Sequence, residues 1–86
     1  MKVVFHTDFR KRYRKLKLSE QKKVQQRLRL FIEDPKNPIL NDHERIGKYS
    51  GYYSINITGD LRALYQIVGK NVMLFITIGT HSHLYE

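Results

Sequence analysis

The stretch that decides the fold is YYSINITGDLRALYQIVGKNVMLFITI, residues 52–78. It contains three runs rich in β-branched and aromatic residues, at 52–58, 61–68 and 72–78. The runs are separated by GD and GKN, and these residues are typical of tight hairpin turns. The stretch therefore predicts three strands joined as a meander.

The first of these strands has two unlike faces. Ile55 and Ile57 alternate with Ser54, Asn56 and Thr58. Successive side chains of a strand point to opposite sides of a sheet. We therefore expect one apolar face that packs on helices and one polar face that stays open.

Upstream of the meander the sequence predicts a strand and then a helix. KVVFH, residues 2–6, is short and β-branched, and the TD that follows predicts a helix cap at Thr7 or Asp8. Apolar residues then recur at the i, i+4, i+7 spacing of one helical face. These residues are Phe9, Tyr13 and Leu16.

A second helix is predicted in LSEQKKVQQRLRLFIEDP. It opens at Ser19 and is stopped by Pro35, which lacks an N–H and cannot continue a helix. One face carries Val24, Leu28, Phe31 and Ile32. The two helices are expected to form a hairpin.

Residues 35–51, PKNPILNDHERIGKYSG, show no period and contain two Pro, two Asn and two Gly. They predict a loop that is about as long as compact domains tolerate. Loops of this length more often contribute to function than serve only as connections. The resulting order, β-α-α-β-β-β, predicts an α+β fold in which a helical hairpin packs on one face of an antiparallel sheet. With 41% hydrophobic residues in 86, we expect one domain over residues 1–86.

Positive charge is concentrated at one end of the sequence. The net charge is +8, and residues 1–29 hold 11 basic and 2 acidic side chains. Such a block attracts phosphate backbones and raises encounter rates. The alternative is that Lys and Arg only solvate two amphipathic helices. A plain basic module that binds RNA or DNA is therefore one candidate function.

Cysteine is absent, so the sequence has neither disulfides nor a thiolate metal site. The first residues are too briefly apolar for a signal peptide, and no apolar run approaches the roughly 20 residues that span a bilayer. We expect a cytoplasmic protein that does not use a membrane.

The motifs of several large enzyme classes are missing. The sequence has no Gly-rich phosphate loop, no H-E-x-x-H, no G-x-S-x-G and no carboxylate cluster for Mg²⁺. An enzyme acting on nucleic acid would then need imidazole acid–base chemistry and guanidinium charge stabilisation, with no cofactor. That chemistry suits RNA, whose 2′-OH is an internal nucleophile. The candidate side chains are His43, Glu44, Asn56, Asp60, Arg62, His81, His83 and Tyr85.

Each candidate also has a less specific interpretation. His81 and His83, with His43 as a third ligand, have the composition of a zinc site, but Cys and a helical H-x-x-x-H are both lacking. An isolated His near a strand end is often a polar surface residue. Arg62 lies among apolar residues and needs an anionic partner, which could be Asp60 or Glu44 in a salt bridge.

The run GYYSINITGDLRALYQIVGKNVMLFITIGTHSHLY, residues 51–85, resembles the C-terminal half of the RelE/ParE superfamily of type II toxins. Its ending IGTHSHLY is most similar to YafQ-like and related RelE-type mRNA interferases. The expected strand and basic helical hairpin before it fit the same family. The resemblance implies cleavage of mRNA, commonly in the ribosomal A site, by a small basic toxin that a cognate antitoxin protein holds inactive.

The resemblance also implies roles for single residues. His81 matches the C-terminal catalytic histidine and would be the general acid. His43 matches the loop histidine of a D-H-x-L-x-G pattern, although Glu44 and Arg45 displace its apolar residue. Asp60 matches an aspartate that serves as, or orients, a base for the 2′-OH. Arg62 matches an arginine placed against the scissile phosphate.

Tyr85 occupies a terminal aromatic position that stacks on a base or anchors the tail. Asn56 departs from the family pattern, which has a histidine on this strand. An amide transfers no proton at neutral pH, so either His43 and His81 suffice or the activity is weakened. Expected partners are the antitoxin, mRNA and ribosomal RNA, with DNA reached only through the antitoxin. Ribosome and substrate contacts are expected from the basic block, represented by Arg12, Lys15 and Lys22.

One rival function uses the same fold. A ParE-like toxin would bind DNA gyrase and cleave no nucleic acid. A terminal imidazole argues against this rival, because a protein that only binds has no need of one.

Overall fold

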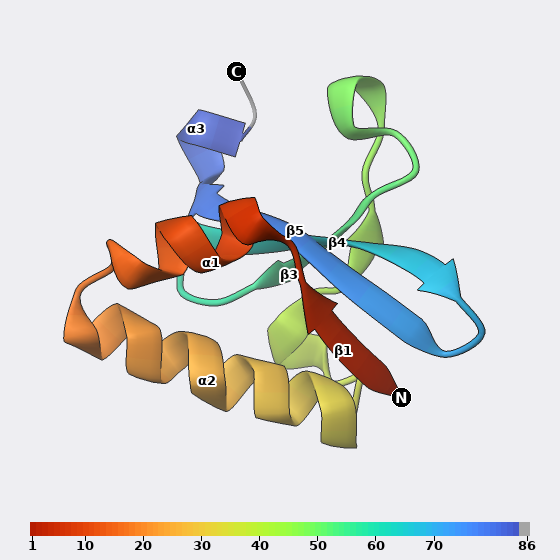
Figure 1. The fold of residues 1–86 in the computed structure, drawn as a ribbon, viewed down its shortest axis with the longest axis horizontal. Helices are drawn as coiled ribbons and strands as arrows, with labels where there is room; N and C mark the ends of the chain where they lie inside the picture. Colours follow the sequence, from red (N-terminus) through yellow and green to blue (C-terminus); the bar gives the residue numbers. More distant parts are fainter. Residues whose placement is uncertain (85–86) are drawn as a thin grey trace.

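The computed structural model describes residues 1–84, and Figure 1 shows their arrangement. A sheet occupies the middle of the molecule, with the long helix α2 below it in this view and α1 beside strand β5. The elements in chain order are β1 (Lys2–Phe5), α1 (Thr7–Arg14), α2 (Leu18–Glu33), the 3-10 turn η1 (Pro38–Leu40), β2 (His43–Glu44), the 3-10 turn η2 (Gly47–Tyr49), β3 (Tyr53–Asn56), β4 (Leu61–Gly69), β5 (Val72–Thr80) and α3 (His81–Leu84).

The sheet has five strands in the order β1-β5-β4-β3-β2. Strands β3, β4 and β5 pair antiparallel, which confirms the meander. Strand β1 instead pairs parallel with β5, so the expectation of a wholly antiparallel sheet is wrong at this edge. Parallel pairing requires a long connection between strands, and the helices and the remaining strands provide it here.

The helices begin slightly differently from the expectation. The cap of α1 is His6, whose Nδ1 accepts a hydrogen bond from the N–H of Asp8 at 3.0 Å, so neither Thr7 nor Asp8 is the cap. Helix α2 begins at Leu18, one residue before the predicted Ser19. It ends at Glu33, two residues ahead of Pro35, as the missing proline N–H requires.

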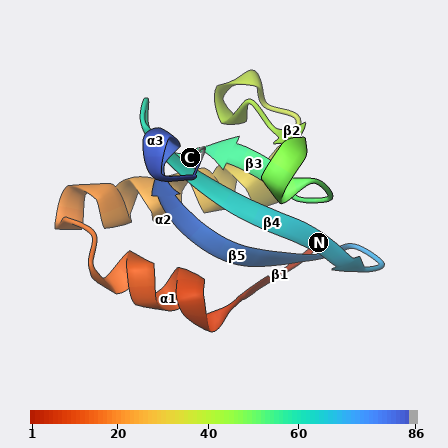
Figure 2. The same ribbon diagram turned by 90° about the horizontal axis from the view of Figure 1, so that it is seen from above.

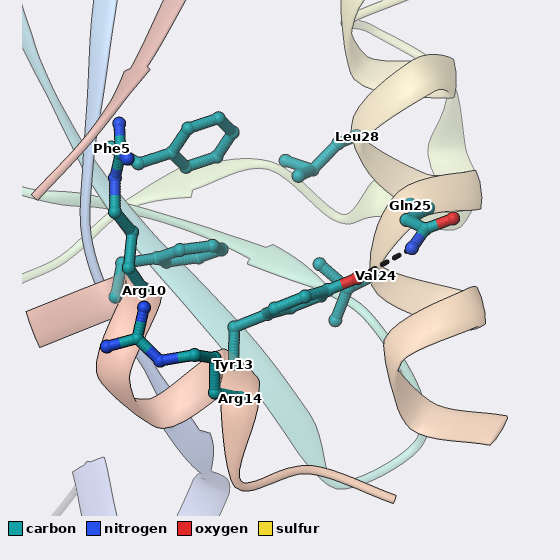
Figure 3. Close-up of a pocket in the computed structure, with 8 residues that line it drawn as sticks. Phe5, Arg10, Tyr13, Arg14, Val24, Gln25 and Leu28 are labelled. Carbon is teal, nitrogen blue, oxygen red and sulfur yellow. Dashed lines mark hydrogen bonds between the residues drawn. The ribbon is translucent and has the colours of Figure 1, made fainter. Parts of the chain in front are cut away.

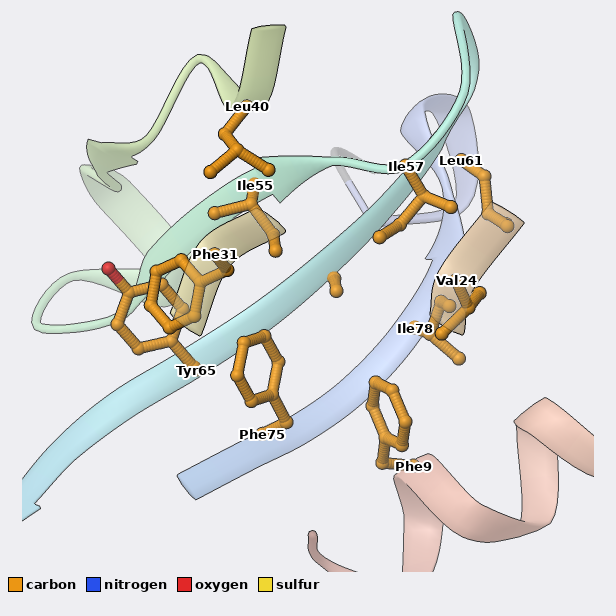
Figure 4. Close-up of a cluster of buried hydrophobic side chains, with 11 residues drawn as sticks. Phe9, Val24, Phe31, Leu40, Ile55, Ile57, Leu61, Tyr65, Phe75 and Ile78 are labelled. Atoms are coloured by element: carbon orange, nitrogen blue, oxygen red, sulfur yellow. The ribbon is translucent and has the colours of Figure 1, made fainter. Parts of the chain in front are cut away.

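The core lies between α2 and one face of the sheet (Figure 4). Phe75 packs edge-on against Phe31 of α2, with ring centroids 5.5 Å apart, and α1 contributes Phe9. Burial of each such side chain stabilises the fold by about 1.5–3 kcal/mol. Ile32 was expected on the buried face of α2, but it is 48% exposed.

The predicted loop over residues 35–51 contains short structured elements. Leu40 at the end of η1 is fully buried against the core. Strand β2 then pairs antiparallel with β3, which adds a fifth strand that the sequence pattern did not predict. The chain around η2 and helix α3 both rise on the side of the sheet opposite α2 (Figures 1 and 2). None of the helices within residues 1–84 is long and apolar enough to cross a membrane.

Candidate active site

The candidate residues from the strands lie on the sheet face that points away from the core. Asn56 of β3 pairs with Arg62 of β4, and Arg62 pairs with Gly79 of β5. Paired residues of neighbouring strands share a face, and adjacent residues along a strand alternate. Since Ala63 and Ile78 belong to the core cluster, Asn56 and Arg62 are on the opposite face.

His81 is held against the turn between β3 and β4. Its backbone N–H donates to the main-chain oxygen of Asp60 at 2.7 Å and lies 3.3 Å from Asp60 Oδ1. The pairing of Leu61 with Thr80 places this turn next to the first residue of α3. Two candidate residues that are 21 positions apart in the sequence are therefore in direct contact.

Arg62 contributes to the same turn. Its Nη1 donates to the main-chain oxygens of Thr58, at 2.9 Å, and Leu61, at 3.3 Å. Within residues 1–84 it forms no salt bridge with Asp60 or Glu44, so the salt-bridge interpretation of this residue is not supported. Its Nε and Nη2 make no hydrogen bond to the described part of the chain, and these donors point to a role toward a ligand.

Thr58 organises the turn that carries Asp60. Its Oγ1 accepts hydrogen bonds from the N–H of Leu61, at 2.9 Å, and of Asp60, at 3.3 Å. Thr58 thus supplies both a side-chain acceptor to the turn and a main-chain acceptor to Arg62. Hydroxyl residues commonly stabilise turns in this way.

His43 lies one strand further across the sheet. It pairs with Ser54, which is two residues from Asn56 along β3, so His43 is on the same face. Its Nδ1 is 2.7 Å from the main-chain oxygen of Asn41. A carbonyl is only an acceptor, so this contact favours the tautomer with the proton on Nδ1 and leaves Nε2 available for proton transfer.

The neighbouring Asp42 forms a contact that the sequence analysis missed. Its Oδ2 accepts a hydrogen bond from the hydroxyl of Tyr65 at 2.7 Å. Burial raises the pKa of the Asp42 carboxyl, while the bond from Tyr65 opposes that rise. Burial, followed by the contact with Asp42, raises the pKa of the Tyr65 hydroxyl above its ordinary value. A tyrosine in an otherwise apolar strand indicates that its hydroxyl has a hydrogen-bond partner, because a buried hydroxyl needs one.

Asn56 has an acceptor without a partner. Its Oδ1 is buried and forms no hydrogen bond within the described chain, and the same is true of Ser54 Oγ. Buried polar atoms are normally satisfied, so an exception on a candidate site face is informative. The amide carbonyl is therefore a buried acceptor that the described chain leaves unsatisfied.

The substrate-binding candidates of the basic block are divided between two surfaces. Lys22 lies on α2 with Lys23 and Arg29, in a shallow polar depression. Arg12 and Lys15 instead line a groove together with His83, close to the candidate catalytic residues. Tyr85 lies outside the described residues.

No metal centre is formed by the residues that the structure describes. Within residues 1–84, no three His, Asp or Glu side chains come together in an arrangement that could hold an ion. The zinc site considered for His43, His81 and His83 is therefore not assembled in this structure.

A larger groove, of about 430 Å³, lies between α1, α2 and β1 (Figure 3). Its walls are apolar, with Phe5, Val24 and Leu28 among them, and Arg10 and Arg14 stand at its rim. None of the candidate catalytic residues lines it. It is a second surface feature, separate from the candidate active site.

Comparisons with solved structures show that this fold is shared with bacterial toxins. The YoeB/ParE toxin from Agrobacterium tumefaciens superposes with a TM-score of 0.76 at 21% identity, over 94% of this chain and 99% of that one. A YafQ mutant from E. coli gives a TM-score of 0.76 at 20% identity, over 98% and 97%. The E. coli DinJ–YafQ complex gives 0.73 at 20% identity, over the same shares.

No curated protein sequence matches this chain. The family model described as a bacterial toxin of type II toxin–antitoxin system, YafQ, matches residues 1–86. That match covers the whole chain and agrees with the fold and with the resemblance found in the sequence. This chain belongs to the YafQ family of type II toxin–antitoxin toxins.

Proposed function

We propose that this toxin is an endoribonuclease that cleaves mRNA, and that it does so on the ribosome. The observation that carries the proposal is the contact between His81 and Asp60, which fixes an imidazole-bearing residue beside a carboxylate at one end of the sheet. Arg62 lies next to this pair and supplies a cation. An acid, a base and a guanidinium are the groups that RNA cleavage needs.

The proposed reaction uses the 2′-OH of the substrate as nucleophile. A base removes the 2′-OH proton, the 2′-oxygen forms a bond to phosphorus, and the bond from phosphorus to the 5′-oxygen breaks. The leaving oxygen takes a proton from a general acid, so the products are a 2′,3′-cyclic phosphate and a 5′-OH. We assign the acid to His81 and assign to Asp60 the role of accepting the 2′-OH proton or orienting the base.

Arg62 is proposed to offset the charge that gathers on the phosphoryl oxygens in the transition state. Preorganised donors of this type contribute about 3–4 kcal/mol to other reactions. Because Nη1 is committed to two carbonyls of the turn, the guanidinium has a fixed position and would turn Nε or Nη2 to the phosphate.

His43 is the second imidazole of the proposed site. Its Nδ1 is occupied by the contact with Asn41, so Nε2 is the nitrogen proposed to exchange a proton with the substrate. Asn56, where the family has a histidine, cannot transfer a proton. Its place beside Arg62 in the sheet puts it next to the proposed phosphate site as a neutral polar residue.

The proposed partners follow from the family and the charge. The solved complex of E. coli YafQ with DinJ supports a cognate antitoxin for this chain as well. The cations of α2, represented by Lys22, are proposed to hold ribosomal RNA phosphates. We place this activity in the cytoplasm, where mRNA is translated, with DNA reached only through the antitoxin.

A purified translation system with one mRNA tests the proposal. Addition of the toxin should yield discrete cuts in the message, mapped by primer extension, before protein synthesis stops. A gyrase-binding toxin would leave both message and translation intact. A plain basic binder would inhibit only at high dose and low salt, without cuts. Either of these outcomes would refute the nuclease assignment.

A further inference from the structure

A groove of about 400 Å³ runs from the end of α1 to α3, and we call it the terminal groove. Leu16, Leu61 and Ile78 are among its apolar lining residues, and Arg12, Lys15 and His83 are its basic ones. Leu61 and Ile78 are almost fully buried, so they form the floor. The groove thus combines an apolar floor with a cationic rim.

The imidazole of His83 has a defined position in this groove. A Cβ built on Gly79 would lie 3.4 Å from His83 Cδ2, so the ring packs directly over the strand where glycine leaves room. The backbone N–H of His83 also donates to Thr80 Oγ1 at 3.2 Å. His83 is exposed, with one edge of its ring against Gly79, and exposed aromatic surfaces of this kind stack on nucleobases.

Two cations, Arg12 and Lys15, and one carboxylate, Glu20, line the terminal groove, and Arg12 is also paired with Asp8. Glu20 is the acidic residue in its lining, and Glu20 Oε1 already accepts a hydrogen bond from the backbone N–H of Lys17. Arg12 donates its Nε to Asp8 at 3.1 Å, which orients the guanidinium and leaves its other N–H groups for a ligand. Lys15 is exposed and adds a second positive charge.

Apolar floor, aromatic ring and cations together match the chemistry of a nucleotide. The base has two apolar faces that suit the floor and the imidazole, and the phosphate suits Arg12 and Lys15. One end of the groove lies beside the proposed active site, because Gly79, which lines the groove, pairs with Arg62 on the neighbouring strand. Leu61 separates Asp60 from Arg62 in the chain, and His83 is two residues from His81.

We propose that the terminal groove binds one nucleotide of single-stranded RNA adjacent to the scissile phosphate, with its base on His83 and its phosphate on Arg12. This inference rests on the proposed ribonuclease function and adds a specific subsite to it. A nucleotide bound in the terminal groove would fix the position of the message along the protein. The 2′-OH and the phosphate of the cleaved bond would then lie at His81, Asp60 and Arg62.

The test measures binding of an RNA that cannot be cleaved. A fluorescein-labelled 2′-O-methyl adenosine hexamer has no free 2′-OH, and its binding is followed by fluorescence anisotropy with the full chain. His83→Ala should weaken binding about 5- to 100-fold, the range for loss of one stacked base. His83→Phe should restore most of the affinity because it keeps the ring. Arg12→Gln should lower the slope of log affinity against log salt by about 0.7.

Two controls separate stacking from charge. Lys70→Gln removes an equal charge from the turn between β4 and β5, at the opposite end of β5 from the groove, and should leave His83-dependent stacking unchanged. A hexamer of the same charge without bases should bind wild type and His83→Ala equally. An equal loss for both hexamers would overturn the stacking role.

The outcomes distinguish this inference from the proposed function. If His83→Ala and Arg12→Gln bind the hexamer as tightly as Lys70→Gln does, the terminal groove is no nucleotide site, whether or not mRNA is cut. If the hexamer binds as expected while wild type leaves mRNA intact, the subsite stands and the nuclease function fails. If an acidic amphipathic peptide, but not the hexamer, shifts the NMR signal of the His83 amide, the groove is a protein site and the inference is wrong.

Discussion

The backbone N–H of His81 and the main-chain oxygen of Asp60 are joined by a 2.7 Å hydrogen bond, which fastens α3 to the turn before β4. Because this bond involves only main-chain atoms, it persists when either side chain is replaced. Substitutions at the two positions therefore report on the chemistry of the side chains, with little effect on the position of the helix.

Asp60→Ala should reduce the rate of mRNA cleavage by about 10²–10⁴, the usual contribution of a positioned acid or base. Asp60 is exposed, so the melting temperature should change little. Asp60→Asn separates the two roles assigned to the residue, because an amide can orient a neighbour but accepts no proton. Single-turnover cleavage of one mRNA measures both variants. Wild-type rates for the alanine variant would remove Asp60 from the mechanism.

Arg62→Ala should lower the cleavage rate by about 10²–10³, the effect of removing one preorganised donor. Lysine should rescue only part of this loss, since it lacks the planar set of donors. The guanidinium also holds the carbonyls of Thr58 and Leu61, so circular dichroism melting must accompany the kinetics. If Arg62→Ala regains the wild-type cleavage rate at a lower temperature at which it also regains its fold, Arg62 only stabilises the turn and has no role at the phosphate.

Asn56→His should raise the cleavage rate, by up to about 10²-fold, because it restores an imidazole beside Arg62 where the amide transfers no proton. The variant should also show a new dependence of rate on pH near neutrality, which Asn56→Gln, the matched control, should lack. An unchanged rate for the histidine variant would mean that His43 and His81 already supply all proton transfer.

Tyr65→Phe should destabilise the protein by about 1 kcal/mol through loss of the hydrogen bond to Asp42. The size of the effect should depend on pH. The pKa of Tyr65 is raised above its ordinary value of 10.0, so the stabilisation is fully present below pH 10 and declines as pH rises above it, where the unfolded chain ionises first.

Urea unfolding of wild type and Tyr65→Phe at pH 8 and pH 11 measures this difference. Wild type should lose more stability than the variant between the two values, so that the gap between them narrows. A gap that stays constant would contradict the coupling between Tyr65 and its buried environment. If folded Tyr65→Phe no longer cleaves mRNA, the hydrogen bond from Tyr65 to Asp42 also positions the neighbouring His43.

Local sequence patterns were sufficient where structure depends on neighbouring residues. The turns at 59–60 and 69–71 and the alternation of polar and apolar residues in β3 follow from periodicity and turn chemistry, but Ser54 on the polar face is fully buried and that face is not open there. Strand β2 was missed because its two residues, His43 and Glu44, are exposed and polar, and their pairing with β3 depends on the rest of the sheet. The parallel pairing of β1 with β5 likewise depends on partners about 70 residues away in the chain.

The sequence predicted which residues belong to the candidate site but not how these residues lie relative to one another. The contact between Asp60 and His81 follows from the register that pairs Leu61 with Thr80, and spacing in the sequence does not encode that register. The presence of Arg12 and His83 in the same groove depends on where α1 runs relative to β5. Helix α1 was predicted, but its orientation arises from packing of Phe9 in the core.

The central claim is that the imidazole of His81 takes part in cleavage of mRNA, and one measurement tests it most directly. Ribosomes programmed with a single mRNA are incubated with wild type, His81→Ala or the neighbouring control Ser82→Ala, and the message is mapped by primer extension. Wild type and Ser82→Ala should give the same discrete cut, whereas His81→Ala should cut at least about 10²-fold more slowly with an unchanged melting temperature. A His81→Ala variant that cuts the same position at the wild-type rate would contradict the account.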